Sequence, residues 1–491
     1  MTTDSTPPTT KPVMGIFRNW TSLVGVVLIL SSLFAFVLLF LLDVLAPTAN
    51  PYVGILTYIV APAFGFMGLA IVIAGLAWRH YRRIKDLGAP PSFQVDFTRP
   101  RDRRLLAFFL GGSVLFLLVT AVLSYHTYHF TESVEFCGQA CHTVMKPELV
   151  TYLNGPHARV SCVECHIGPG AGWYVKSKLS GMYQVYATAT DKFPRPIPTP
   201  IRNLRPAQET CEQCHWPAKF VGDLDRTYQY FAADETNTPY TIRMTMKVGG
   251  ADPKHGPVGG IHWHMNVGNK VQYISLDETR QEIPWVRVVD PQGVVREFRS
   301  EGFTNDITGY TVRTMDCMDC HNRPAHRYET PNDAVNLAMA LGEIDRTLPS
   351  IKANVIAALT EEYATETDAV ESIATKLAET YKDEPRIRKV IDVAQRIYRD
   401  NFFPEMKASW KVYPDNIGHK DWPGCFRCHD GKHTTADGKD TIKANDCNAC
   451  HTILSQGQGD ELRLLTPEGQ PFKHPGGDYD GLCNDCHDGT M

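Results

Sequence analysis

The sequence contains seven pairs of closely spaced cysteines, and a histidine follows each pair directly. Six pairs have two residues between the thiols, and the first pair in the chain has three. The pairs with their histidines are Cys137/Cys141/His142, Cys162/Cys165/His166, Cys211/Cys214/His215, Cys317/Cys320/His321, Cys425/Cys428/His429, Cys447/Cys450/His451 and Cys483/Cys486/His487. All 14 cysteines belong to these pairs, so one chemistry should account for every thiol in the chain.

Three kinds of chemistry use paired cysteines. Disulfides suit an even number of thiols in an exported domain, but they have no use for a neighbouring histidine. Zinc sites combine one cysteine pair with another and do not need a histidine after each pair. Attachment of c-type haem needs both features, because two thiols add to the porphyrin vinyl groups and the adjacent histidine binds the iron. We therefore predict seven covalently bound haem c groups, the first with an attachment loop one residue longer.

The remaining histidines are candidates for the second iron ligand. A haem that only passes electrons is usually held on both faces, whereas a haem that binds substrate leaves one face open. The spare histidines on the haem-bearing side that we predict as distal ligands are His157, His262, His264, His326, His419, His433 and His474. His262 and His264 would share a face in a strand, so at least one of them should reach an iron. Met145 remains for the first haem, and a full set of ligands favours electron transfer over catalysis at an open haem.

Three apolar segments precede the first cysteine. Ser22–Leu42, Val53–Trp78 and Leu105–Ser124 each reach the length of about 20 residues that a membrane-spanning helix needs. The link between the first two segments has no Lys or Arg, whereas the link from Arg79 to Arg104 is rich in both. The positive-inside rule then puts the N-terminus in the cytoplasm and all residues after Ser124 in the periplasm of a bacterial inner membrane. This compartment is also the oxidising one in which haem attachment takes place.

The predicted secondary structure changes along the exported part of the chain. Tyr240–Val248, Val271–Leu276 and Val286–Val289 resemble strands separated by turns, and they predict a β-rich insert without cysteine. Residues 331–410 are rich in Ala, Leu, Ile and Glu, which predicts helices. The predicted regions are a cytoplasmic leader (1–19), a three-helix membrane anchor (20–125), a trihaem region (126–235), the β-rich insert (236–310), the fourth haem motif (311–330), a helical segment (331–410) and a C-terminal trihaem region (411–491).

The fold class that follows is a membrane-anchored multihaem cytochrome c. It would have three N-terminal transmembrane helices and a loop- and helix-rich periplasmic multihaem region with a small β-rich insert. The 43 % of apolar residues exclude wholesale disorder, and the formal charge of −5 excludes a generally basic nucleic-acid binder. No nucleic acid is therefore expected among the partners.

The short distance from Ser124 to Cys137 puts the first haem at the membrane surface. The natural electron donor there is a lipid-soluble quinol, menaquinol or ubiquinol, whose oxidation releases two protons that need acceptors. His126 and His129 stand three residues apart and would share one face of a continuing helix. The other candidates for contacts to the quinol are Lys146, Glu148, Lys176 and Lys178. The lysines would equally suit interfacial snorkelling or phosphate binding, and both roles remain open.

Residues 105–220 resemble the NapC/NirT family of membrane-anchored quinol dehydrogenases. The resemblance is carried by the anchor, by Cys141-His142-Thr-Val-Met145, by Pro156-His157, by Cys162-Val-Glu-Cys165-His166, by the stretch Gly172–Lys178 and by Cys211-Glu-Gln-Cys214-His215. It implies a methionine-associated first haem beside the quinol site and a basic residue near Lys176 or Lys178 that contacts quinol. That family typically has one helix and four haems. The whole layout instead resembles the heptahaem inner-membrane cytochromes of metal-reducing bacteria, which implies quinol oxidation that feeds periplasmic carriers.

The expected function is electron transfer from membrane quinol through a haem chain to a periplasmic electron-carrier cytochrome or reductase. One alternative is a terminal reductase of a small nitrogen or sulfur oxyanion, which would need one open haem face and a cationic pocket. A second is an electron-transfer or docking subunit of a larger respiratory complex that uses the β-rich insert as its interface. A homo-oligomer of the chain is a further alternative for its assembly. Haem propionates would make the exported part more acidic, which favours a partner with a basic docking patch.

Overall fold

The computed structural model describes residues 20–45, 60–85, 98–140, 142–168, 171–201, 205–249, 259–265, 268–304, 306–444, 446–477, 479 and 481–490. The chain forms two compact units, one of Met1–Glu132 with Ile167–Gln184 and the other of Ser133–His166 with Val185–Met491. The first unit contains the N-terminal helices, and the second contains all seven cysteine motifs.

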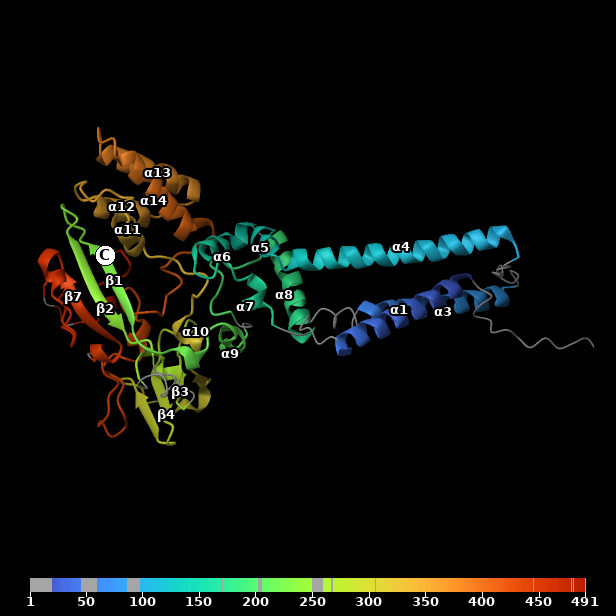
Figure 1. Ribbon diagram of the computed structural model, residues 1–491, viewed down its shortest axis with the longest axis horizontal. Coiled ribbons are helices and arrows are strands. Elements are labelled where there is room, and N and C mark those ends of the chain that lie inside the picture. Colours follow the sequence, from blue (N-terminus) through green and yellow to red (C-terminus); the bar gives the residue numbers. More distant parts are fainter. Residues whose placement is uncertain are drawn as a thin grey trace, which may run out of the picture. The chain divides into compact units, whose positions relative to one another are not determined.

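The first unit is built from α1 (Trp20–Leu45), α3 (Ala61–Ile84), α4 (Pro100–Thr131) and most of α8 (Ala171–Ala189). Helices α1 and α3 pack closely at Gly25 and Gly68. A Cβ atom added to Gly25 would lie only 2.6 Å from the Gly68 carbonyl oxygen. Small residues that let two backbones approach are typical of helix pairs in membranes. Helices α1, α3 and α4 are the long helices drawn in blue to cyan in Figure 1.

Two helices among the described residues are long and apolar enough to cross a membrane, Trp20–Leu39 and Ala61–Arg82. They correspond to the first two predicted segments, although residues 53–59 lie outside the described part of the chain. Leu105–Ser124 lies within α4, where several side chains are outside the described set, so its crossing of the membrane stays a prediction. Within the described residues, two of the three predicted segments therefore form helices suited to cross a membrane.

The helical part of the second unit surrounds the main core. It contains α11 (Pro331–Ala340), α12 (Ile351–Thr360), α13 (Glu366–Thr380) and α14 (Ile387–Asn401), which confirms the helices predicted from composition. Thr330 and Thr365 cap α11 and α13 by accepting backbone N–H groups with their side chains. The core includes Ile373, Leu377 and Val390, and it extends to the aromatic residues after α14. Short helices α5 (Val134–Gln139) and α6 (His142–Asn154) precede the second motif.

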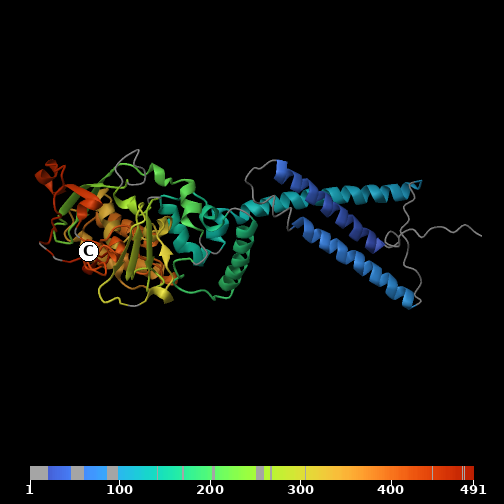
Figure 2. The same ribbon diagram turned by 90° about the horizontal axis from the view of Figure 1, so that it is seen from below.

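Two antiparallel sheets complete the second unit (Figures 1 and 2). The first has the order β1-β2-β7, with β1 at Leu224–Phe231, β2 at Pro239–Met246 and β7 at His451–Gly457. The second has the order β5-β4-β3-β6, with β3 at Lys270–Ile274, β4 at Trp285–Val289, β5 at Val295–Arg299 and β6 at Arg313–Thr314. The three predicted strands are confirmed as β2, β3 and β4, with slightly different ends.

The sheets cross the predicted boundaries of the β-rich insert. Strand β2 pairs with β1 and with β7, and both of those partners lie outside residues 236–310. Met246 is the register partner of His451, so this sheet reaches a motif histidine near the C-terminus. The insert is therefore not one self-contained sheet, because its first strand completes a sheet with the C-terminal haem region.

Candidate metal centres

Each of the six motifs with two intervening residues begins in a short helical turn. The turns are α7 (Cys162–His166), η3 (Cys211–Gln213), α10 (Cys317–Cys320), η8 (Gly424–Arg427), η9 (Cys447–Ala449) and η11 (Cys483–Asp485). In four of them the amide of the motif histidine donates to the carbonyl of the first cysteine, at 2.7 Å for His215 and His321, 3.0 Å for His429 and 2.9 Å for His487. Residues three and four apart share a face in such a turn, so both thiols and the imidazole can meet one porphyrin.

The first motif differs from the others. Cys137 lies in α5, and His142 begins α6. Cys141 and the side chain of His142 lie outside the described residues, so haem attachment at this motif stays a prediction. Met145 is half-buried one turn after His142 on α6, and the two backbone positions share a helix face. Its role as an iron ligand likewise stays a prediction.

The other six motif histidines each lie beside one distal histidine. The ring centroids are 6.2 Å apart for His166 and His326, 6.0 Å for His215 and His157, 6.4 Å for His321 and His262, 5.9 Å for His429 and His264, 6.3 Å for His451 and His419, and 6.0 Å for His487 and His474. An iron atom with a nitrogen about 2 Å away on each side separates two imidazole centroids by roughly 6 Å. The residues present therefore fit six haem irons held on both faces.

Hydrogen bonds fix the orientation of several distal rings. The Nδ1 atoms of His157 and His264 lie 2.8 Å and 2.9 Å from the carbonyl oxygens of Pro324 and Ile261. The Nδ1 atom of His326 lies 2.9 Å from the carbonyl oxygen of Glu148. When Nδ1–H donates to a carbonyl, Nε2 is left to bind metal, and metal-binding histidines commonly show this arrangement.

His262 and His264 both have a motif partner, although the strand expected around them is not observed. The segment Ile261–Met265 forms a 3₁₀ helix, η5. Residues two apart in such a helix point in different directions, because one turn takes three residues. The two rings accordingly reach different motifs, at His321 and His429.

The contacts of His433 do not support its predicted role as an iron ligand. Its side chain is almost completely buried, and Nδ1 lies 2.8 Å from Asp430 Oδ1. Its Nε2 lies 2.7 Å from the carbonyl oxygen of Ile283. Both nitrogens therefore face protein acceptors, and neither is left for an iron. His433 is close to a motif along the chain, but this spacing could not show that Asp430 and the distant Ile283 carbonyl would occupy both ring nitrogens.

Thiol contacts join motifs that are consecutive in the chain. A hydrogen bond with Cys137 lowers the pKa of the Cys162 thiol to about 7, so the first and second motifs touch. A hydrogen bond with Cys317 is the main cause of the raised pKa of Cys211, so the third and fourth motifs touch as well. Haem attachment would convert these thiols into thioethers, which do not titrate. The consecutive motifs would still be neighbours.

Electrostatic interactions between cysteines connect further motifs in the same order along the chain. Burial chiefly raises the pKa of Cys165, Cys320, Cys450 and Cys483, and in each case a cysteine of a neighbouring motif contributes. The pairs from successive motifs are Cys165 with Cys214, Cys320 with Cys425, Cys450 with Cys425, and Cys483 with Cys447. The seven motifs thus lie next to one another in the order of the sequence.

The predicted attachment residue Cys486 has a contact that differs from the contacts of the other thiols. Its side chain is exposed, and its Sγ donates to the hydroxyl of Tyr479 at 3.5 Å. The same hydrogen bond is the main cause of the raised pKa of Tyr479. The chain brings Tyr479 over the η11 turn, a fold-back that the spacing of the motif could not predict. A thioether sulfur has no proton to donate, so attachment of haem at Cys486 would break this bond and stays a prediction.

Two buried arginines bridge neighbouring motifs, and the sequence interpretation missed both. Arg205 donates to the carbonyl of Glu164 inside the second motif at 2.9 Å and to that of Glu209, just before the third motif, at 2.8 Å. Arg427, inside the fifth motif, donates to the carbonyl of Asp319 inside the fourth motif at 2.6 Å. Within the described residues these guanidinium groups bond only to carbonyls. A buried cation needs a compensating anion, and haem propionates would supply one.

The candidate quinol contacts separate into two groups. In the first unit, His126 and His129 lie exposed on α4, and the ring of Tyr125 lies 4.3 Å from that of His129. On α8, Lys178 Nζ lies 3.7 Å from Glu132 Oε1 and donates to Thr131 Oγ1 at 3.3 Å, at the C-terminal end of α4.

Lys176 has a different environment from Lys178. Its ammonium lies over the ring of Trp173, 5.1 Å from the centroid, and its side chain is exposed. In the second unit, Lys146 forms an ion pair with Glu366. Glu148 contacts His326 Nδ1 at 3.2 Å through its carboxylate. Glu148 therefore supports an imidazole in the second unit, a role that spacing along the chain could not reveal.

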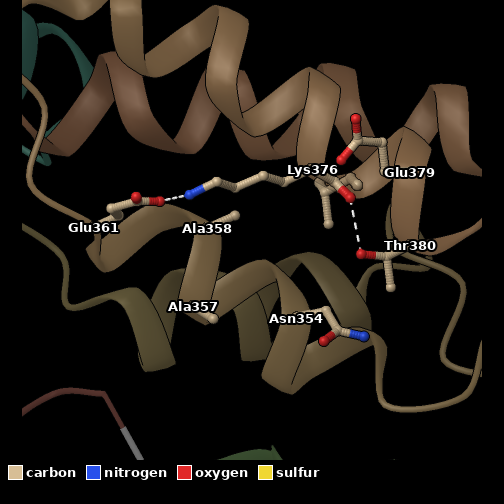
Figure 3. Close-up of a pocket in the computed structure, with 8 residues that line it drawn as sticks. Asn354, Ala357, Ala358, Glu361, Lys376, Glu379 and Thr380 are labelled. Carbon is tan, nitrogen blue, oxygen red and sulfur yellow. Dashed lines mark hydrogen bonds and ion pairs between the residues drawn. The ribbon is translucent and has the colours of Figure 1, made fainter.

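The pocket shown in Figure 3 is not a candidate centre. It lies between α12 and α13 and is lined by residues such as Asn354 and Thr380, with an ion pair between Lys376 and Glu361. None of its lining residues is a histidine or a cysteine. Across the described residues, no three His, Cys, Asp or Glu side chains lie close enough together to hold a metal ion.

Comparisons with known proteins agree with the motif chemistry. Residues 99–196 match the model of the N-terminal region of the NapC/NirT cytochrome c family. The chain is 42 % identical over 501 residues to the cytochrome c-type protein ImcH of Geobacter sulfurreducens, an alignment that covers 98 % of this chain and 97 % of the relative. No solved structure matches the chain.

Proposed function

Because the chain belongs to the NapC/NirT cytochrome c family, we propose that it oxidises a membrane quinol and passes the electrons through seven haems to a periplasmic acceptor. The family and the apolar N-terminal helices support covalently bound haem c and electron transfer at a membrane. The observation that carries the finer proposal is the set of six histidine pairs with centroids 5.9–6.4 Å apart. Bound haem supplies one-electron redox chemistry.

The pairs favour electron transfer over reduction of an oxyanion. In every pair the motif histidine faces a second imidazole, so no position is left for a substrate at that centre. The first motif, where the described residues do not include the full ligand set, is the one place where the reductase alternative retains support. A docking role for an independent β-rich insert loses support, because β2 is joined to β7 of the C-terminal haem region.

The order of the motifs supports one continuous path. Contacts between consecutive motifs would bring neighbouring porphyrins together from the first attachment site to the seventh. Arg205 and Arg427 would each hold two successive motifs together, because each donates hydrogen bonds to backbone carbonyls at or beside both motifs. Electrons would then enter at the first motif, near the membrane, and leave toward the C-terminal motifs.

The donor site would lie where α4 leaves the membrane. His126 and His129 would accept the protons that quinol releases, because their exposed rings can exchange them with water. Lys176 would donate a charge-assisted hydrogen bond to a quinol oxygen. Lys178 would instead hold α8 against the end of α4 through Glu132. This arrangement makes Lys176 the contact residue and Lys178 the positioning residue.

Turnover by the full chain in nanodiscs tests this function. A menaquinol analogue serves as the donor and a soluble c-type cytochrome as the acceptor, under anaerobic conditions. The proposal expects acceptor reduction that depends on the chain and on the quinol, with no stimulation by nitrite or sulfite. Turnover that appears only with nitrite or sulfite as the acceptor would support the reductase instead.

A further inference from the structure

Helix α8 carries several large apolar side chains that are exposed on one face. Leu179 is 60 % exposed, and Met182 and Tyr183 are each 67 % exposed. With Tyr186, which is also exposed, they occupy positions i, i+3, i+4 and i+7, so they share one face of the helix. A continuous exposed apolar surface of this kind marks an interaction site on a protein.

The N-terminal part of α8 belongs to the unit that contains the membrane helices. Residues 167–184 are grouped with residues 1–132, and the ion pair between Lys178 and Glu132 joins α8 to the C-terminal end of α4. Figures 1 and 2 both show α8 running across the axis of α4. The predicted crossing of the membrane by α4 would then place α8 along the membrane surface.

The residues that flank the apolar face suit a membrane interface. Lys176 stands seven residues before Tyr183, so the two lie on the same face of α8. The Lys176 ammonium covers the Trp173 ring, which combines a cation with an amphipathic aromatic side chain. Lysine and aromatic side chains beside an apolar stripe are typical of helices that lie at the level of lipid headgroups.

We propose that α8 is an interfacial helix, with Leu179, Met182 and Tyr183 in the lipid of the outer leaflet and Lys176 at the headgroups. The occupant of the apolar face is the bilayer that holds α1 and α3, because α8 shares a compact unit with those helices. This inference goes beyond electron transfer and does not depend on quinol oxidation.

Spin-label accessibility in nanodiscs tests the placement. The reporter is Met182→Cys in the full haem-loaded chain, and the matched control is Gln184→Cys, which is also exposed but points away from the apolar face. Oxygen concentrates in lipid, whereas a charged nickel chelate stays in water. The unsubstituted chain is treated with the label in parallel to give the background.

The proposal expects the ratio of oxygen to nickel accessibility to be several-fold higher at position 182 than at position 184. Equal ratios at the two positions would overturn it. Exclusion of both probes at position 182 would also overturn it, since a protein surface would then cover this face. Leu179→Cys provides a second reporter on the same face if Met182→Cys does not load haem. Because no quinol is present, a failure here is distinct from a failure of quinol oxidation.

Discussion

The imidazole rings of His262 and His321 lie nearly parallel, with centroids 6.4 Å apart and an interplanar angle of 7°. His262 belongs to η5, well before the fourth motif in the chain, and its Nδ1 faces the carbonyl oxygen of Val248. A residue from an earlier segment would therefore supply the second iron ligand at the fourth motif. The neighbouring His264, whose ring lies 5.9 Å from that of His429, would do the same at the fifth motif.

Removal of one distal imidazole should convert one haem from low spin to high spin. His264→Ala leaves the iron held by His429 with an open face, because no other imidazole is paired with His429 among the described residues. The measurement is electron paramagnetic resonance of the oxidised protein, with the haem content determined in parallel. A variant that carries all its haems and shows no new high-spin signal would contradict the pairing.

His433→Ala is the matched control for that experiment. Its imidazole is buried but faces Asp430 and the Ile283 carbonyl, so the spin state of every haem should remain unchanged. The variant should still be less stable by about 1–3 kcal/mol, since a buried carbonyl loses its donor. Chemical denaturation measures this loss. A high-spin signal in this variant would restore His433 as a ligand.

Loss of the Arg427 guanidinium should lower the reduction potential of at least one haem. A buried positive charge beside the fourth and fifth motifs favours the reduced state, which carries one positive charge less. Arg427→Gln should change the oxidised-to-reduced ratio about tenfold at a fixed potential, or ~59 mV for a one-electron couple. Spectropotentiometric titration measures the shift. Arg243→Gln, at an exposed pair with Asp225, is the control that should leave the potentials unchanged.

Lys176 and Lys178 should respond differently to removal of charge. Lys176→Ala should slow reduction by a menaquinol analogue about tenfold or more, since a charge-assisted hydrogen bond is worth roughly 1.5–3 kcal/mol. Lys178→Ala should instead loosen α8 from Glu132, which hydrogen exchange along α8 would detect. Stopped-flow reduction kinetics compare the two variants. Equal rates for Lys176→Ala and the unsubstituted chain would remove Lys176 from the donor site.

Lys352 should make stability depend on pH in the alkaline range. Burial lowers its pKa from 10.5 to about 8 in the folded chain. The unfolded chain then binds more protons than the folded chain between these values, so the free energy of unfolding should rise with pH from about 8 to 10.5. Lys352→Met should reduce this slope, as followed by denaturation at a series of pH values. An unchanged slope in the variant would contradict burial of the charged amine.

Much of the local structure could be predicted from the sequence, because it depends on short-range patterns. Turn signals between strand-like stretches indicated β2, β3 and β4, and composition indicated helices α11–α14. The pairing of β2 with β7 could not be predicted, since it joins residues about 200 positions apart whose partners no local pattern specifies. The bridging role of Arg205 and the contact of His433 with the Ile283 carbonyl oxygen also depend on long-range packing.

The central claim is that quinol alone delivers electrons to the haems of this chain. Its most direct test is anaerobic mixing of the purified chain in nanodiscs with a menaquinol analogue, followed by optical absorption of reduced c-type haem. The account predicts rapid reduction of several low-spin haems with no other protein present, and slower reduction in Lys176→Ala. Absence of any haem reduction until a partner subunit is added would contradict it.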